Sequence, residues 1–413
     1  MDKAFFINNR KKLEERMEND TILLLFAGRA PYKSADELYP FIPNRNFYYM
    51  TGIDEDKIIL LISKIGEKIS ERLFIQRPDP IMAKWVGATI SEDEAKERSG
   101  IDSIEYLDKF EDAIGSILNG NKVEKIYLDL ERQEIRTSFT ESQEFARVIV
   151  KRYPYIQIKN IYHDISEFRT IKSKEEIELI RKAIEITNEG ILNMMKNAKP
   201  GMMEYEIEAY FDFTLKKNGI RNRAFETIAG SGKNGTILHY SDNNSKTKDG
   251  DLILFDLGAQ YKYYNADITR TFPVNGKFTE RQKEVYNVVL EAMKAVEEAA
   301  RPGISYGQLN EAAKRVLTEG CKKLGLIKED NEISKYYYHS VSHYLGLDTH
   351  DVGMYNVELK PGMVITNEPG LYIEEEGIGI RIEDDLLITE DGCENLSKDI
   401  IKTIEEIESF MNK

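Results

Sequence analysis

Short apolar runs alternate with charged stretches along the N-terminal part of the chain. Apolar runs of strand length occur at 22–27, 57–63, 72–76 and 125–129. Charged stretches at 10–18 and at Glu92–Arg98 have the composition of exposed helices. Strands that alternate with helices are typical of a mixed α/β domain, and this is the fold class that the pattern predicts.

A helix start near residue 173 marks a second domain. Ser173 and Glu176 have the spacing of a capping box, in which each side chain accepts a hydrogen bond from the other residue's amide. Apolar residues then recur at helical spacing, as Ile177, Ile180, Ile184 and Ile191. The sequence therefore predicts two domains, residues 1–168 and 169–413.

The second domain contains two segments of similar order. Pro200-Gly201 precedes an amphipathic helix that runs through about Lys217, and Pro302-Gly303 precedes another, from about Tyr306 to Leu317. Each helix is followed by a similar strand segment, Lys248–Gly258 in one case and Lys360–Gly370 in the other. Pro-Gly turns are common enough to recur by chance, but the matching order of elements favours two similar α/β halves.

Composition and charge narrow the function classes. The net charge is −15 over 413 residues, and binding to nucleic acid would require a basic surface, so nucleic acid is not an expected partner. The N-terminus lacks the pattern of a secretory signal, and the apolar run Ile22–Ala27 is too short to cross a bilayer, so we expect no membrane partner. Two cysteines cannot form a disulfide framework, which favours a reducing, cytoplasmic location.

Histidines are concentrated near the C-terminus. The chain has only five, and three of them, His339, His343 and His350, lie within thirteen residues on a predicted loop that contains Gly346. Imidazole ligates metals of borderline softness and titrates near neutral pH. This clustering indicates a functional site.

Four carboxylates occupy matched places in the two halves. Asp256 and Glu368 each follow an apolar, strand-like run and precede a glycine, and a second acid follows each, Asp267 and Glu383 respectively. Each pair is spaced as on antiparallel neighbouring strands, so the four acids are expected to converge. Asp384 and Asp385 are expected to support this site or to face solvent.

Four buried carboxylates require protons or a cation to offset their charge. With His343, the set offers hard oxygen donors and one imidazole, which suits Mn²⁺, with Zn²⁺, Co²⁺ and Fe²⁺ as alternatives. Five ligands around one ion would leave little room for a substrate. Two ions about 3.5–4 Å apart, bridged by carboxylates as in two-metal hydrolases, would explain the surplus.

With these residues in view, the chain resembles the Xaa-Pro aminopeptidases (aminopeptidase P), which have a pita-bread catalytic domain. The stretches that carry the resemblance are Gly235–Tyr240, Asp256 with Gly258, Asp267–Phe272, His343 with His350, Glu368–Tyr372, Gly379–Asp385 and, in the first domain, Asn44–Gly52. The resemblance covers nearly the whole chain. It implies a creatinase-like N-terminal α/β domain and a pita-bread C-terminal domain with two α/β halves related by a pseudo-twofold axis.

The resemblance also implies roles. The metal ligands would be Asp256, Asp267, His343, Glu368 and Glu383. Asp256 would bind one ion, His343 with Glu368 the other, and Asp267 and Glu383 would bridge the two. The substrate pocket would include His239, His339, His350, Tyr372 and Arg381, and the catalytic residues would be Glu368, His239 and His350.

The implied reaction removes the N-terminal residue from peptides that have proline second. A hydroxide bridging two divalent ions, Mn²⁺ foremost, would attack the peptide carbonyl. Glu368 would move the proton of the attacking water, His350 would stabilise the oxyanion, and His239 would orient the substrate or relay a proton. Homodimers or homotetramers are the expected assemblies.

Three alternatives stay open at this point. An Xaa-Pro dipeptidase shares the ligands and fold but would refuse longer peptides. A methionine aminopeptidase is disfavoured because it would leave the large N-terminal domain without a role. A non-catalytic binding module on the same fold is disfavoured because such relatives lose metal ligands, whereas all five are present here.

The sequence departs from the family pattern in two places. Tyr261–Ala266 stands where small, glycine-rich residues are usual, and the acid usual before Trp85 is missing. These departures leave the substrate preference open but not the metal ligands. Trp85, the only tryptophan, is expected either to pack in a core or to reach a neighbouring subunit's site.

Overall fold

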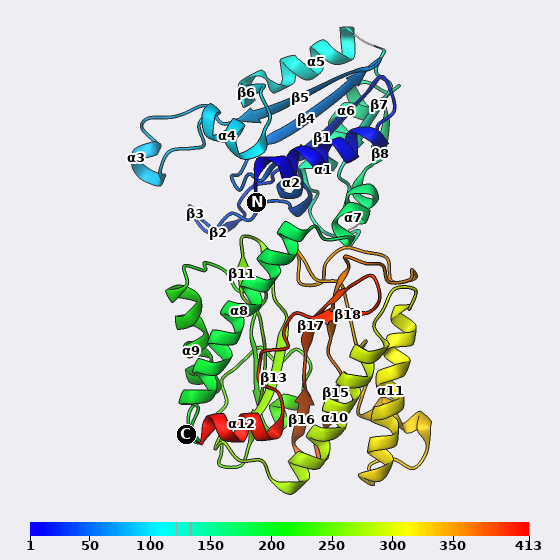
Figure 1. Ribbon diagram of the computed structural model, residues 1–413. Coiled ribbons are helices and arrows are strands. Elements are labelled where there is room, and N and C mark those ends of the chain that lie inside the picture. The colour runs from blue at the N-terminus through cyan, green and yellow to red at the C-terminus, as the bar shows by residue number, and fades with distance from the viewer. Residues whose placement is uncertain (121, 132–133, 413) are drawn as a thin grey trace. The chain divides into compact units, whose positions relative to one another are not determined.

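A computed structural model describes residues 1–120, 122–131 and 134–412. The chain forms two compact units, Met1–Phe168 and Arg169–Lys413 (Figure 1). Within the described residues, no helix has both the length and the apolar character needed to cross a membrane.

The first unit is built on a six-stranded mixed sheet in the order β6-β5-β4-β1-β7-β8. In that order the strands are Ile104–Tyr106, Lys68–Ile75, Ile59–Ile65, Thr21–Phe26, Lys125–Leu128 and Gln157–Asn160. The remaining elements are α1 (Lys3–Arg16), β2 (Tyr32–Ser34), β3 (Glu37–Leu38), α2 (Arg45–Thr51), α3 (Ala83–Val86), α4 (Glu92–Ser99), η1 (Leu107–Lys109), α5 (Phe110–Gly120), α6 (Glu141–Arg152) and α7 (Tyr162–Thr170).

The four strand-like runs of this unit are confirmed as β1, β4, β5 and β7. The first helix begins earlier than the charged stretch at 10–18 predicted. Asp2 caps it by accepting a hydrogen bond from the Ala4 amide, and Phe5 and Phe6 are buried. Trp85 is 81% exposed, so it does not pack in the core of this unit.

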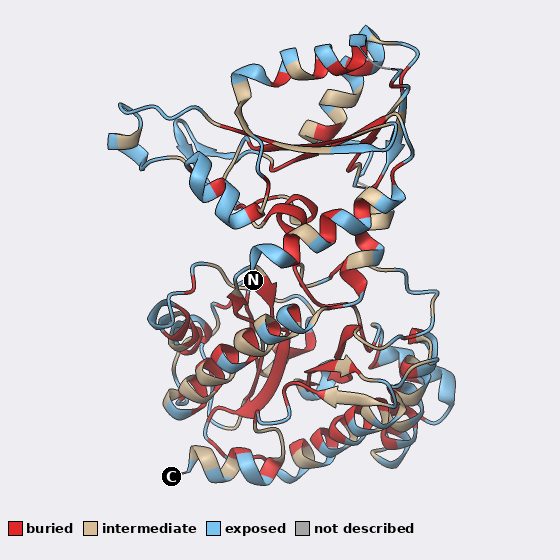
Figure 2. Cartoon of the chain, turned by 45° about the horizontal axis from the view of Figure 1, so that its top comes forward, coloured by how far each residue is buried: buried red, intermediate tan, exposed pale blue. Residues whose placement is uncertain are grey.

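The second unit contains two three-stranded antiparallel sheets with helices packed against them. One sheet has the order β13-β10-β9 and the other β14-β17-β18. Their strands are β9 (Ile228–Ser231), β10 (Leu252–Leu257), β13 (Ile268–Pro273), β14 (Val364–Asn367), β17 (Asp384–Ile388) and β18 (Cys393–Asn395). The strands are mostly buried, whereas the long helices are buried along one side only (Figure 2).

Helices and short hairpins complete this unit. The helices are α8 (Lys174–Asn197), α9 (Glu204–Lys217), η2 (Gly232–Thr236), α10 (Glu280–Ala299), α11 (Tyr306–Lys323), η3 (Asp330–Lys335), η4 (Glu374–Glu376) and α12 (Ile404–Met411). The hairpins are β11 (Gln260–Tyr261) with β12 (Tyr264–Asn265), and β15 (Gly370–Ile373) with β16 (Ile378–Arg381).

The internal repeat predicted from the sequence is present. Helices α8 and α9 pack together, as do α10 and α11, and each pair is followed by an antiparallel strand pair, β10–β13 or β14–β17. The helices after the two Pro-Gly turns are α9 and α11. The second of these runs to Lys323, beyond the predicted end at Leu317.

Because α8 packs closely on α9, any side chain at Gly190 is predicted to destabilise the folded protein. An added Cβ would lie 2.3 Å from Phe211 Cδ2. Gly190→Ala should lower the free energy of unfolding by about 1–3 kcal/mol, measured by chemical denaturation, because the helices must move apart. Gly115→Ala on α5 is the control, since nothing lies within 4 Å of its added Cβ. Equal stability of the two variants would show that the close contact is not required.

Candidate metal centre

The strand pairs bring the four predicted carboxylates to equivalent places. Asp256 lies in β10, and Asp267 immediately precedes β13, its antiparallel partner. Glu368 immediately follows β14, and Glu383 immediately precedes β17, which is the antiparallel partner of β14. Because antiparallel neighbours run in opposite directions, the end of one strand meets the start of the next. The arrangement expected from the spacing of these acids is therefore present.

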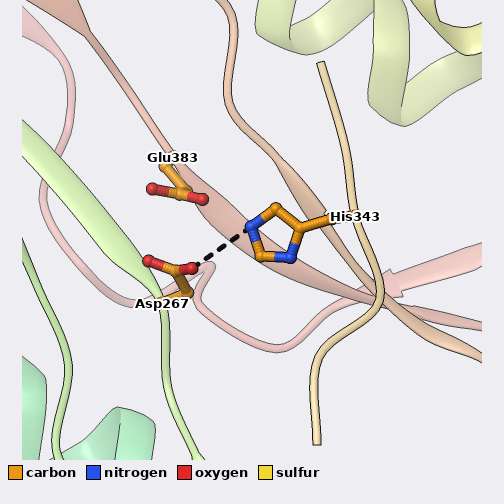
Figure 3. Close-up of side chains that lie close together, drawn as sticks. All are labelled: Asp267, His343 and Glu383. Atoms are coloured by element: carbon orange, nitrogen blue, oxygen red, sulfur yellow. Dashed lines mark ion pairs between the residues drawn. The ribbon is translucent and has the colours of Figure 1, made fainter. Parts of the chain in front are cut away.

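His343 faces the acids from the loop between η3 and β14. Its Nε2 is 3.4 Å from Asp267 Oδ2 and 3.4 Å from Glu368 Oε1. Ligand atoms of Asp267, His343 and Glu383 all lie within 4.8 Å of one another, and the three side chains point toward a common centre (Figure 3). Asp267 and Glu383 are buried and His343 is largely so.

Burial and mutual repulsion perturb this cluster. Burial raises the pKa of Asp267 well above its usual range, and the charges of Asp256 and Asp385 raise it further. Burial also raises the pKa of Glu383, with Asp267 and Glu368 adding to the effect. The pKa of Glu368 is raised mainly by burial. These carboxyls therefore hold their protons to higher pH than exposed acids do, unless a cation offsets their charge.

The donors fit a divalent cation. His343 Nδ1 lies 2.9 Å from the Tyr344 carbonyl oxygen, so Nδ1–H donates there and Nε2 is left with a free lone pair toward the acids. Asp256 Oδ1 is buried and has no hydrogen-bond partner among the described residues. Oxygen donors with one imidazole form the set that Mn²⁺, Zn²⁺, Co²⁺ or Fe²⁺ accepts. The residues present thus suit the metal set that the sequence suggested.

Two threonines that the sequence reasoning missed hold the acids in place. Thr269 Oγ1 donates to Glu383 Oε2 at 2.7 Å, and Thr366 Oγ1 donates to Glu368 Oε1 at 3.3 Å. The first could have been found from strand periodicity. Thr269 and Thr271 alternate along β13, in step with Asp267 just before it, so the three share one face. No comparable sequence signal marks Thr366.

Asp384 and Asp385 are both buried, so of the two roles expected for them the structure agrees with support of the site and not with exposure to solvent. Asp385 Oδ2 accepts a hydrogen bond from the Asp267 amide at 3.2 Å. Asp384 pairs with Arg270 at 2.6 Å and with Lys402. Arg270 also donates to the Glu383 carbonyl at 2.6 Å, so this buried ion pair fixes the backbone that carries Glu383.

The remaining histidines lie at the edge of the cluster. The rings of His343 and His350 meet edge to face with centroids 4.3 Å apart. Burial, with a further effect of His343, lowers the pKa of His350, and burial lowers that of His339 to about 4. His239 is exposed in the turn after η2, close enough for its charge to contribute to both shifts. His339 and His350 are therefore neutral imidazoles at neutral pH.

Arg381 is buried and links the metal cluster to His339. Its Nη2 donates to Asp256 Oδ2 at 2.6 Å, and its Nη1 donates to the Tyr372 hydroxyl at 2.9 Å. The Tyr372 hydroxyl lies 2.9 Å from His339 Nε2, while His339 Nδ1 lies 2.8 Å from the Ser340 carbonyl oxygen. His339 therefore donates from Nδ1 and accepts from Tyr372, so its ring plane is fixed. The structure thus brings Arg381, Tyr372 and His339 together at the site.

Comparisons with known proteins agree with this architecture. Residues 178–390 match Metallopeptidase family M24, and residues 6–127 match the aminopeptidase P N-terminal domain. The chain therefore belongs to the aminopeptidase P group of the M24 metallopeptidases, which confirms the resemblance seen in the sequence. Its fold is accordingly a creatinase-like N-terminal domain followed by a pita-bread catalytic domain.

Individual relatives match over their full length. The Xaa-Pro aminopeptidase of Escherichia coli K12 is 36% identical over 98% of this chain and 97% of its own. A solved structure from Bacillus anthracis is 55% identical and covers 100% of this chain and 99% of its own, with a TM-score of 0.99. Aminopeptidase P from E. coli, solved with the inhibitor Pro-Leu, is 35% identical with a TM-score of 0.92 and covers 100% of this chain and 98% of its own.

The raised carboxyl pKa values predict that cation binding releases protons. Because the pKa values of Asp267 and Glu383 are raised, a cation must displace protons from the cluster, and the affinity for Mn²⁺ should rise with pH. Calorimetry in two buffers of different ionisation enthalpy measures the number of protons released. Glu383→Gln should bind Mn²⁺ more weakly and release fewer protons. Glu374→Gln, an exposed acid, should match the parent protein. A pH-independent affinity with no proton release would contradict this electrostatic account.

Proposed function

We propose that this protein is a Xaa-Pro aminopeptidase that removes the N-terminal residue from peptides with proline second. The observation that carries the proposal is the convergence of Asp267, His343 and Glu383 in the fold of a metallopeptidase family. Asp256 and Glu368 complete the proposed ligand set. Two divalent cations held there, Mn²⁺ foremost, would supply a water acidified toward neutral pH and positive charge to offset a developing oxyanion.

Glu368 is the proposed proton carrier. A general acid–base group works best when its pKa lies near the working pH, and burial raises that of Glu368 in this direction. Its Oε1 accepts from Thr366, and its Oε2 lies 3.9 Å from His339 Nδ1 on the side of the proposed pocket. Glu368 therefore takes a proton from the attacking water and passes it toward the leaving nitrogen.

His339 and Tyr372 are proposed to form the wall for the proline ring. Their rings lie 5.5 Å apart between centroids, and Tyr337 packs edge-on against His339 at 5.1 Å. The hydrogen bonds of His339 to Tyr372 and Ser340 occupy both ring nitrogens and fix the ring. A proline nitrogen in peptide linkage has no N–H to satisfy, so a ring-lined wall can select it by shape. Arg381 holds Tyr372 in this position.

His350 and His239 are proposed to act on the substrate carbonyl. Both are exposed, and His350 is neutral at neutral pH because its pKa is lowered. A neutral imidazole can donate one hydrogen bond to an oxyanion without bringing a second positive charge to the metal cluster. His239 orients the substrate or relays a proton from the opposite half of the domain.

The location and assembly of the protein are further parts of the proposal. Cys321 and Cys393 are both free thiols, and burial raises the pKa of Cys321 to about 12 and that of Cys393 to about 11, so neither is reactive. This supports a cytoplasmic protein. Ile81, Trp85 and Val86 form an exposed apolar segment in the first unit, which supports a homodimer or homotetramer.

Peptide length and sequence separate the aminopeptidase from the dipeptidase. The purified protein with Mn²⁺ is incubated with Xaa-Pro, Xaa-Pro-Yaa and Xaa-Ala-Yaa peptides, and products are identified by mass. We expect release of Xaa from Xaa-Pro-Yaa and little cleavage of Xaa-Ala-Yaa, because the wall selects the proline ring. Cleavage of the dipeptide alone would favour an Xaa-Pro dipeptidase. No cleavage with metal bound would favour a non-catalytic module.

Glu368→Gln tests the proton carrier. The substitution keeps the shape and the Thr366 hydrogen bond but removes the titrating group. It should lower kcat by about 10²- to 10⁴-fold, as expected for the loss of a general acid–base group. Metal content is measured in parallel, because the same side chain is a proposed ligand. Wild-type turnover in a fully loaded Glu368→Gln protein would refute the role, and the exposed control Glu374→Gln should retain full activity.

A further inference from the structure

A buried group of three charges, Arg169, Lys172 and Asp351, adjoins the loop that carries His350. Asp351 Oδ1 accepts from Arg169 Nη2 at 2.5 Å, and Oδ2 accepts from Lys172 Nζ at 2.9 Å. The three side chains are only 1–2% exposed. Burial alone would raise the pKa of Asp351, but Lys172 and Arg169 hold it below its usual value. The carboxylate is thus ionised and held from both sides.

Asp351 in turn closes the loop around it. Its amide donates to the Tyr344 carbonyl at 2.9 Å, and its Oδ1 accepts from the Asp348 amide at 3.4 Å. Gly346 packs directly on the charges, because an added Cβ would lie 2.3 Å from Asp351 Oδ2 and 2.9 Å from Lys172 Cε. Segment 344–351 is therefore one compact turn built around the Asp351 carboxylate.

The same turn is joined to the strands of the metal cluster. The Gly346 carbonyl accepts from the amide and from the side chain of Asn265, two residues before Asp267, at 3.0 and 3.1 Å. Glu176, predicted from the sequence only as a helix cap, also accepts from the Tyr264 hydroxyl at 2.9 Å. Lys172, just before α8, thus contacts the turn, and Glu176 in the first turn of α8 contacts the hairpin that leads to Asp267.

His350 depends on this turn for its position. Among the described residues its imidazole has no hydrogen-bond partner, and its one ring contact is with His343. Its orientation must therefore come from its backbone, and Asp351 is the next residue in the chain. Burying three charges costs more than burying apolar side chains of similar volume, so stability alone does not account for the group.

We propose that Lys172 and Arg169 are positioning residues that act through Asp351 to hold His350 edge-on against His343. Neither cation is proposed to touch the substrate. The catalytic consequence rests on the proposed function, in which His350 acts on the substrate carbonyl. The structural consequence does not, so the two can be tested separately.

Two variants disturb the buried charges by different means. Lys172→Met removes one cation and keeps a side chain of similar length. Gly346→Ala leaves every charge in place but forces Asp351 to move. The matched controls are Gly307→Ala, where the nearest atom to the added Cβ is 3.7 Å away, and Arg10→Met, which removes a fully buried cation from the first unit. Neither control lies in segment 344–351, so an effect seen in the two variants but not in the controls comes from a change in this turn and not from a general loss of stability.

The first readout needs no activity. The chain has five histidines, so a ¹³C-histidine-labelled sample gives five Cε1–H signals that single His→Gln variants assign. Lys172→Met and Gly346→Ala should each shift the signals of His350 and His343, because their ring contact changes. The signal of His163, in the first unit, should not move. Gly307→Ala and Arg10→Met should leave all three signals in place. Unchanged His350 and His343 signals in folded Lys172→Met or Gly346→Ala would overturn the proposal, whatever the enzyme cleaves.

The second readout is a double-mutant cycle on Xaa-Pro-Yaa cleavage. Lys172→Met should lower kcat by about tenfold to a hundredfold, as a displaced catalytic group does, with little change in KM. Adding His350→Ala to the Lys172→Met protein should lower kcat little further, because Lys172→Met has already displaced the His350 ring. If the losses in kcat of the two single variants multiply in the double variant, Lys172 does not act through His350. Absence of cleavage by the parent protein would refute the proposed function and leave the spectroscopic result standing.

Discussion

The second unit depends on one electrostatic constraint, which is that several carboxylates and one imidazole are buried around a common centre. Desolvation and mutual repulsion raise the pKa values of Asp267, Glu368 and Glu383 together. A cluster of this kind is unfavourable unless its charge is offset, and no packing of apolar groups can supply the offset. The paired strands, the supporting threonines and the fixed His343 tautomer all hold donors together against that repulsion. Binding of protons or cations relieves this repulsion, so the fold favours their binding at the centre.

Two other buried acids of this unit form ion pairs with arginine or lysine side chains. Asp384 is paired with Arg270, and Asp351 is paired with Lys172 and Arg169. Within the described residues, no lysine or arginine forms an ion pair with Asp267, Glu368 or Glu383. Lysine and arginine side chains thus pair with the carboxylates that serve as fixed anchors, and none of them pairs with these three proposed ligands. This contrast sets the anchoring acids apart from three of the four proposed carboxylate ligands; Asp256, the fourth, is the exception, because Arg381 pairs with it at 2.6 Å.

Sequence reasoning recovered the parts of the site that local patterns encode. Asp256 and Glu368 could be predicted because each ends an apolar run, and the internal repeat placed their partners on neighbouring strands. The anchoring residues could not be predicted in this way. Asp351 adjoins His350 in the sequence, but its partners Arg169 and Lys172 lie 182 and 179 residues away, and nothing local marks that contact. The early start of α1 was missed for a related reason, because Phe5 and Phe6 are identified as core only by what packs on them.

The two halves of the second unit are alike in backbone but unequal in chemistry. Each contributes two carboxylates, yet His339, His343 and His350 all come from one loop of the second half, and only His239 comes from the first. A symmetric cage of acids would offer equivalent positions to two ions and no preferred direction to a peptide. The imidazoles make one side of the cage distinct, with a neutral His339 held against Tyr372 and a neutral His350 held against His343. On the proposed function, the duplicated strands provide the carboxylates. The loop that carries His339, His343 and His350 occurs in one half only, and it determines the side from which the substrate binds. A buried anchor such as Asp351 has a physical purpose in that loop, since an irregular segment lacks the ladder of hydrogen bonds that fixes a strand.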